Sequence, residues 1–166
     1  TVGFKAESIA VGDFDHDGKL DFAVSNQGDG TVSILLGNGN GAFHPAIPRD
    51  YTIGADLRAA VTRDFNLDGN LDLAIAVAGS NRISILLGNG NGTFTRGDDI
   101  PVGSYPYGIA VGDFNKDGKL DLATANMLGL NVSVLLGNGD GTFGPTDQRD
   151  YSVGGETLCV AVGDFN

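Results

Sequence analysis

The sequence predicts an all-β fold made of consecutive blades, each a four-stranded antiparallel sheet of the kind found in β-propellers. Three observations predict it. A nine-residue acidic motif recurs at a nearly constant interval, an Asn-Gly hairpin motif follows it each time, and no segment shows the apolar period that marks a helix. A fixed repeat of this length is typical of stacked or ring-shaped arrays of small β units.

The acidic motif starts at residues 13, 64 and 113, and a fourth copy begins at residue 164, so the intervals are 51, 49 and 51 residues. The complete copies read DFDHDGKLD, DFNLDGNLD and DFNKDGKLD. The hairpin motif is ILLGNGNGAF at Ile34–Phe43, and it recurs at Ile85–Phe94 and Val134–Phe143. Its first Asn (residues 38, 89 and 138) always lies 25 residues after the first Asp of the loop. Length variation is therefore confined to the segment after each hairpin.

The strands of the first unit can be assigned in order. Ile9–Phe14 is a short apolar run that leads into the acidic loop, Leu20–Asn26 follows the loop, and Thr31–Gly37 follows a glycine-containing turn. The NGNG hairpin, whose Asn and Gly residues tolerate positive φ, leads to a fourth strand at Arg49–Gly54. The matching fourth strands are Asp98–Gly103 and Arg149–Gly154.

These units predict blade one at residues 3–53, blade two at 54–102, blade three at 103–153 and the first strand of a fourth blade at 154–166. Propellers usually close with about four to eight blades. Three are too few, so we expect residues 1–166 to form a segment of one propeller. Further blades of the same protein, or other copies of the chain, would complete it.

The acidic motif has the pattern of a loop that surrounds a hard cation. Carboxylate or amide side chains stand at its positions 1, 3, 5 and 9, so oxygen atoms can converge on one point. The glycine at position 6 allows the chain to turn sharply around that point. Bare polar turns are a poorer interpretation, because adjacent carboxylates repel by roughly 1 kcal/mol per pair in water and by more at lower dielectric.

Other metal sites fit the motif less well. An EF-hand needs Glu at position 12 and flanking helices, whereas position 12 is Val24, Ile75 or Thr124 within a β-like segment. A large, irregular ring of oxygens that includes a backbone carbonyl favours Ca²⁺ over Mg²⁺. Zn²⁺ is disfavoured because no Cys or His stands at a ligand position. The sequence therefore predicts about three Ca²⁺ ions per chain.

The loop after an apolar strand, followed by the GNGxGxF hairpin, resembles the FG-GAP/VCBS repeats of integrin α-subunit propellers and of large bacterial surface and secreted proteins. The resemblance covers the whole chain and implies one Ca²⁺ in each loop between the first two strands of a blade. The implied side-chain ligands are Asp13, Asp15, Asp17 and Asp21, then Asp64, Asn66, Asp68 and Asp72, and finally Asp113, Asn115, Asp117 and Asp121. Backbone carbonyls at position 7 would come from Lys19, Asn70 and Lys119.

Three single residues carry further expectations. Arg63 precedes the second loop where the other copies have glycine, and we expect it to weaken or reshape that site. His16, at the variable position 4, is expected to face solvent. Cys159 corresponds to small residues in the other units, so we expect a buried small side chain rather than a redox role.

The formal net charge of −11 disfavours nucleic acid and anionic membranes as partners. The loops hold ten of the 21 acidic residues (four, three and three), and three divalent cations would bring the charge from −11 to −5. Catalysis has little support, because the sequence has two His, at 16 and 44, neither with a nucleophile partner in a recognisable motif, and no GxSxG elbow. The sequence does not predict membrane insertion either.

We therefore expect a non-enzymatic, calcium-stabilised module that is extracellular or on the cell surface and binds a protein or glycan. Two alternatives stay open at this point. One is a structural repeat of a surface filament or stalk that assembles by edge pairing, and the other is an accessory domain of a secreted enzyme. The sequence identifies no ligand.

Overall fold

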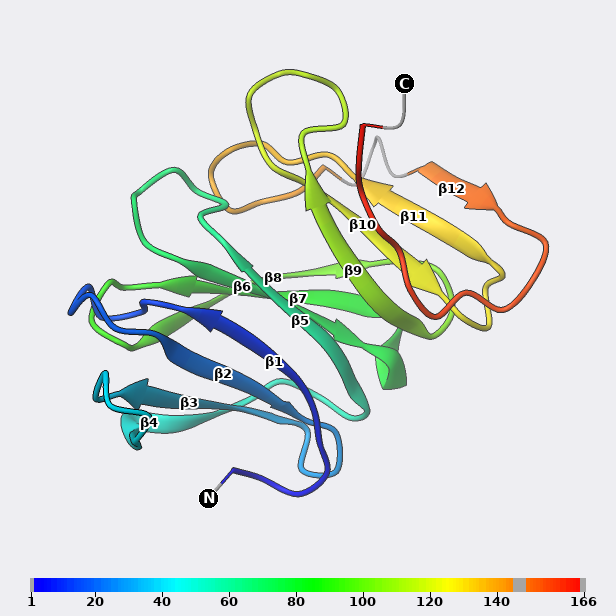
Figure 1. The fold of residues 1–166 in the computed structure, drawn as a ribbon. Helices are drawn as coiled ribbons and strands as arrows, with labels where there is room; N and C mark the ends of the chain where they lie inside the picture. Colours follow the sequence, from blue (N-terminus) through cyan, green and yellow to red (C-terminus); the bar gives the residue numbers. More distant parts are fainter. Residues whose placement is uncertain (1, 145–148, 165–166) are drawn as a thin grey trace.

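The computed structural model describes residues 2–144 and 149–164, and it is all-β as expected, with a single short 3₁₀ turn, η1 (Ala78–Ser80). The strands form three four-stranded antiparallel sheets in which sequence neighbours pair (Figure 1). The first sheet contains β1 (Ala6–Gly12), β2 (Asp21–Asn26), β3 (Thr31–Gly37) and β4 (Phe43–Thr52). The second contains β5 (Leu57–Arg63), β6 (Asp72–Val77), β7 (Arg82–Gly88) and β8 (Phe94–Pro101). The third contains β9 (Pro106–Gly112), β10 (Asp121–Asn126), β11 (Asn131–Leu135) and β12 (Arg149–Ser152).

The three sheets lie side by side, with their first strands next to one another. β1 contacts β5, and β5 contacts β9, so the first strand of each sheet lies at the common inner edge (Figure 1). The segment 156–164 continues this series, because a Cβ added at Gly108 on β9 would lie 2.7 Å from the carbonyl oxygen of Leu158. No strand is assigned to this segment, so the first strand of a fourth blade that the sequence predicted is not formed within the described residues. The arrangement is blade-like.

The cores lie between the sheets. One cluster joins small and β-branched residues of the first sheet, such as Ala23 and Ile34, to Leu73 and Phe94 of the second. A second cluster repeats the arrangement between the second and third sheets. Each buried aliphatic or aromatic side chain contributes roughly 1.5–3 kcal/mol. The sheets therefore depend on their neighbours for stability, as in other repeat proteins.

Two further expectations from the sequence were inaccurate. The fourth strands β4 and β8 begin at the end of the hairpin, earlier than Arg49 and Asp98, because bonds such as that from the N–H of Asn38 to the carbonyl of Ala42 (2.9 Å) make the hairpin tight. Cys159 is exposed, not buried. Its segment packs beside β9 and, among the described residues, no strand pairs with it.

Among the residues that the structure describes, no helix is long and apolar enough to span a membrane.

Candidate metal centre

Each acidic loop leaves the first strand of a sheet and turns back into the second strand through two left-handed residues. The first lies at position 4, where His16, Leu67 and Lys116 have φ of 59°, 61° and 61°. The second is the position-6 glycine, with φ of 80° at Gly18. A Cβ added at Gly18 would meet nothing within 4 Å. Glycine is therefore favoured there by backbone conformation and not by crowding.

The first carboxylate of each loop is fixed by backbone donors. Asp13 accepts the N–H of Asp17 at 3.1 Å and that of Gly18 at 2.9 Å. The corresponding distances are 3.3 and 2.9 Å for Asp64, and 3.1 and 2.9 Å for Asp113. Asp15 also accepts the N–H of Asp17, at 3.2 Å. The loop thus holds its position-1 and position-3 oxygens in place through its own backbone.

The position-9 aspartate has a second, structural role. Asp21 is fully buried, and its two carboxylate oxygens accept the N–H groups of Phe14 at 2.7 Å and of Gly37 at 2.8 Å. It therefore connects the start of the loop to the end of β3. Asp72 and Asp121 form the same pair of bonds with distances of 2.8 Å.

Burial has an electrostatic cost at this position. Desolvation raises the pKa of Asp21 above its usual value, and the nearby carboxylates of Asp15 and Asp13 raise it further. Desolvation likewise raises the pKa of Asp72, with additional contributions from Asp68 and Asp64. A raised carboxylate pKa means that the negative charge is disfavoured in the metal-free loop. A divalent cation would remove that penalty.

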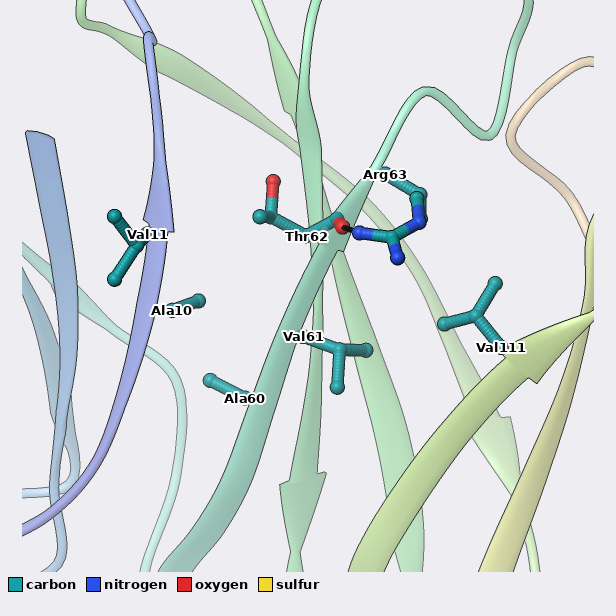
Figure 2. A pocket seen from close by; sticks show the side chains of 7 residues that line it. All are labelled: Ala10, Val11, Ala60, Val61, Thr62, Arg63 and Val111. Carbon is teal, nitrogen blue, oxygen red and sulfur yellow. Dashed lines mark hydrogen bonds between the residues drawn. The ribbon is translucent and has the colours of Figure 1, made fainter. Parts of the chain in front are cut away.

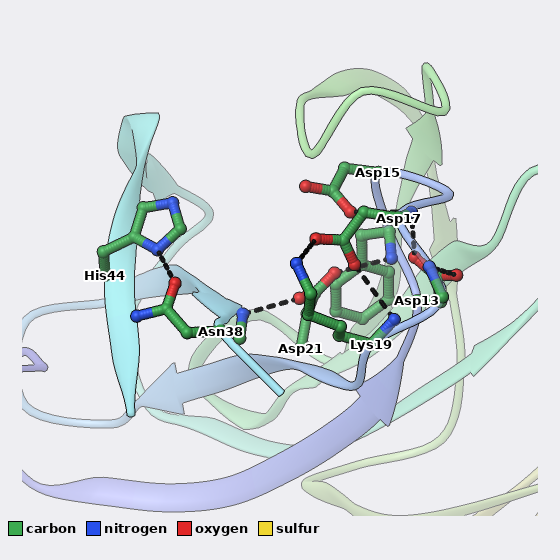
Figure 3. A network of polar contacts seen from close by, with 10 residues as sticks. Asp13, Asp15, Asp17, Lys19, Asp21, Asn38 and His44 are labelled. Atoms are coloured by element: carbon green, nitrogen blue, oxygen red, sulfur yellow. Dashed lines mark hydrogen bonds and ion pairs between the residues drawn. The ribbon is translucent and has the colours of Figure 1, made fainter. Parts of the chain in front are cut away.

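The carboxylates of the first loop converge. One oxygen each from Asp13, Asp15 and Asp21 lies within 4.8 Å of the others (Figure 3). Two unit charges at about 4 Å repel by roughly 1 kcal/mol in water and by about 4 kcal/mol at an effective dielectric near 20. The donor set consists of oxygen atoms alone, which is the preference of Ca²⁺. These residues fit a hard cation.

Position 5 is arranged differently in the first loop. The carboxylate of Asp17 forms an ion pair with the Nζ of Lys19 at 2.6 Å, and this hydrogen bond is the main cause of its lowered pKa (Figure 3). The structure therefore does not bring Asp17 into the group formed by Asp13, Asp15 and Asp21. In the second loop, Asp68 accepts the N–H of Asn70 at 2.8 Å, which lowers its pKa.

The second and third loops keep the same frame with one fewer negative charge. Asn66 and Asn115 stand where the first loop has Asp15, and their amide oxygens accept the N–H of Asp68 at 3.2 Å and of Asp117 at 3.0 Å. The expected disturbance from Arg63 is not seen in these bonds, which match those of the other loops. Its side chain turns away from the loop, and its Nη1 donates to the carbonyl of Thr62 at 2.9 Å.

The loops are also linked across blades, which the sequence analysis did not anticipate. His16 is exposed as expected, yet its Nε2 lies 2.9 Å from the Oδ1 of Asn70 in the second loop. The N–H of Gly92 donates to the carbonyl of Phe14 at 2.8 Å, and Gly141 donates likewise to Phe65 at 3.2 Å. The hairpins of blades two and three therefore support the acidic loop of the preceding blade.

Three blade-like sheets with an acidic loop between their first two strands define a class of acidic-loop β repeats. The family model described as an FG-GAP-like repeat matches residues 13–75 and 64–124, each match running from one acidic loop to the second strand of the next blade. The chain belongs to the FG-GAP-like repeat family. No curated protein matches it.

Proposed function

We propose that the chain is a calcium-stabilised segment of an extracellular β-propeller that binds a protein or glycan and catalyses no reaction. The observation that carries the proposal is the same loop frame, built three times, in which a buried aspartate and a position-1 aspartate are fixed by backbone donors. FG-GAP-like family membership supports the calcium assignment. A bound Ca²⁺ would neutralise carboxylates and stiffen one end of each blade.

The ring is proposed to continue beyond blades one and three. Phe14 and Phe65 are 3% exposed and make edge-to-face contacts with Phe94 and Phe143 of the next blade at centroid distances of 5.4 and 5.7 Å. Their equivalent in blade three, Phe114, is 37% exposed.

The opposite end of the array offers the complementary group. Phe43 corresponds to Phe94 and Phe143 but is 38% exposed. At the blade-three end, Tyr151 is exposed, whereas the hydroxyl oxygen of its equivalent Tyr51 accepts the N–H of Phe94 in the next blade at 2.9 Å. The exposed residues at both ends are thus equivalent to residues that contact a neighbouring blade inside the array. We propose that further FG-GAP blades pack against both end faces.

A non-catalytic role is supported by the partners of the two histidines. His16 pairs with Asn70, and the Nδ1 of His44 lies 3.1 Å from the Oδ1 of Asn38. Neither contact is with a nucleophile or a carboxylate, which general-base activation of a side chain would need. The position-9 carboxylates are already engaged by the backbone. An adhesion or binding role at the loops fits these observations better than hydrolysis.

The test is a comparison of melting temperature in excess Ca²⁺, excess Mg²⁺ and EDTA, together with metal analysis of the dialysed protein. A ligand that binds only the folded state at 100 times its Kd stabilises by about 2.7 kcal/mol per site. We expect a large rise with Ca²⁺, a small one with Mg²⁺ and about three Ca²⁺ ions per chain. An unchanged melting temperature with Ca²⁺ would refute the calcium assignment.

A further inference from the structure

A cavity lies between the first strands of the three sheets, at the end where the metal loops begin. Its volume is about 270 Å³, and Figure 2 shows its wall. The lining residues are Ala10, Val11, Ala60, Val61, Thr62, Arg63 and Val111. The hydroxyl of Thr62 donates to the carbonyl of Asp72 at 2.8 Å and is turned into the sheet. Among the side chains that line it, the guanidinium of Arg63 is the one charged group.

Arg63 differs from the other arginines in its partners. The structure describes the side chains of five arginines, and four form ion pairs: Arg49 with Asp50, Arg58 with Asp56 and Glu7, and Arg82 and Arg96 with Asp99. Within the described residues, the hydrogen bond to the Thr62 carbonyl is the one polar contact of Arg63. In a chain with a net charge of −11, a guanidinium without a carboxylate partner is unusual.

The adjacent aspartate, Asp64, is not a carboxylate partner of Arg63. Asp64 turns its carboxylate into its own loop, where the two oxygens accept the N–H groups of Asp68 and Gly69 at 3.3 and 2.9 Å. The guanidinium instead lies over the gap between β5 and β9, on the side of Val111 (Figure 2). Several of its N–H donors therefore remain available to a group that enters the cavity.

The blade fold itself does not require a cation at this position. The equivalent residues are Gly12 and Gly112, where an added Cβ would lie 2.5 Å from Leu71 and 2.7 Å from Phe114. A side chain in blade one or three would therefore have to displace the side chain of Leu71 or Phe114. Arg63 departs from this pattern in blade two, where its side chain reaches the cavity without altering the bonds of its loop.

We propose that this cavity binds a monoanionic carboxylate with a small branched aliphatic body, whose carboxylate pairs with Arg63. The planar guanidinium presents two parallel N–H donors that match a carboxylate. A single cation balances a single negative charge, whereas a dianion such as phosphate would leave one negative charge without a partner among the lining residues.

The size and chemistry of the wall select the body of the ligand. A volume of 270 Å³ would hold roughly nine waters at about 30 Å³ each, which is space for a short branched acyl group. Val11, Val61 and Val111 would contact that group. Two sources offer this chemistry: a free short-chain acid, and the C-terminal carboxylate of a peptide that ends in a branched aliphatic residue.

The experiment is a titration of the protein, saturated with Ca²⁺, followed by the NMR signals of the valine methyl groups and the Arg63 side chain. Isovalerate represents the free acid, and N-acetyl-leucine represents the peptide terminus. Isovaleramide and N-acetyl-leucinamide are the uncharged controls. We expect saturable shifts at Val11, Val61 and Val111 with at least one acid, at concentrations up to about 10 mM, and none with either amide.

Arg63→Gln should weaken acid binding by about tenfold or more, since it removes the ion pair. Arg63→Gly introduces the residue that the other blades have at this position. It provides a second test of the ion pair if Arg63→Gln does not fold. Lys5→Gln is the control with the same charge change at a distant site. Acid and amide binding equally well, no saturable shift with either acid, or full binding by both Arg63 variants would each overturn the proposal. A repeat in EDTA separates this result from the calcium assignment, because the cavity residues are not the proposed metal ligands.

Discussion

The carboxylate of Asp72 accepts the backbone N–H of Gly88, 16 residues further along the chain, at 2.8 Å. The bond recurs between Asp21 and Gly37 and between Asp121 and Gly137, at the same distance. It connects the end of the acidic loop to the end of the third strand in every sheet. The aspartate at this proposed ligand position therefore also stabilises the blade when no metal is bound.

Replacement of Asp72 by Ala should destabilise the protein even in EDTA. The substitution leaves the buried N–H groups of Phe65 and Gly88 without acceptors, and each such group costs about 1–3 kcal/mol. We expect a loss of roughly 3 kcal/mol in the free energy of unfolding, measured by urea denaturation.

The matched variant is Asp68→Ala in the same loop. Asp68 is exposed, so its removal should change stability in EDTA by no more than about 0.5 kcal/mol. In excess Ca²⁺, however, the Asp68→Ala protein should lose the stabilisation that calcium binding to the second loop provides, about 2.7 kcal/mol at 100 times Kd. Equal losses for the two variants in EDTA would contradict the structural role of Asp72.

Repetition made most of the fold predictable from sequence. Three aligned copies fixed the strand order, and the Asn-Gly hairpins fixed the connection from the third strand to the fourth. The starts of β4 and β8 were missed because the hairpin bonds extend pairing beyond the apolar run. The exposure of Cys159 was missed because burial of a first strand depends on its neighbours in space, which its own sequence does not reveal.

The candidate site was predictable in part for the same reason. Alternate acidic positions and the glycine at position 6 are local signals, and they indicated which oxygens share a loop. The contact of His16 with Asn70 joins residues of two blades that are 54 positions apart. The turn of Asp17 toward Lys19 depends on side-chain rotamers. Neither is encoded in a local pattern.

Asp17→Ala should remove one Ca²⁺ per chain, if position 5 is a ligand as the family resemblance implies. Metal analysis after dialysis against low Ca²⁺ would report the change, and about two ions should remain, because each loop supplies its own ligands. Loss of all three ions would mean that contacts such as His16 with Asn70 couple the sites strongly. Retention of all three would show that Asp17 is not needed for binding.

Stability of the metal-free protein should depend on pH in a direction opposite to that of the calcium-bound protein. Burial raises the pKa of Asp72 and Asp21 above 3.8, so the folded state binds protons more readily than the unfolded state. The penalty is present at neutral pH and is relieved as pH falls through the folded pKa toward 3.8. Asp99, whose pKa is lowered in the folded state, affects stability at lower pH. Its stabilisation is present above pH 3.8 and is lost as the pH falls through the folded-state pKa of Asp99.

Melting curves recorded in EDTA should therefore shift to higher temperature as the pH falls from about 7 toward 3.8. In saturating Ca²⁺ the shift should reverse, because protons compete with the cation for the carboxylates. A metal-free protein whose melting temperature falls steadily over this range would show that the buried aspartates carry no such penalty. The measurement needs low protein concentration, as the isoelectric point is near 4.2.

The exposed phenylalanines at the two ends of the array allow the proposed continuation of the ring to be tested. Phe65 is 3% exposed and Phe114 is 37% exposed, although they occupy equivalent positions in blades two and three. Phe65→Ala should cost about 3–5 kcal/mol, as expected for a buried phenylalanine. Phe114→Ala should cost much less in the isolated chain, because part of its surface is already in water.

The same difference should appear in association. The end faces that contain Phe43 and Phe114 expose apolar side chains, although the segment 156–164 covers part of the second face, and such surfaces recruit partners. We expect the wild-type chain to self-associate with rising concentration in sedimentation velocity runs, and Phe43→Ser or Phe114→Ser to reduce that association without unfolding. A strictly monomeric wild-type chain whose Phe114→Ala variant is as unstable as Phe65→Ala would mean that the face of blade three is already covered. The proposed cover by further blades would then be wrong.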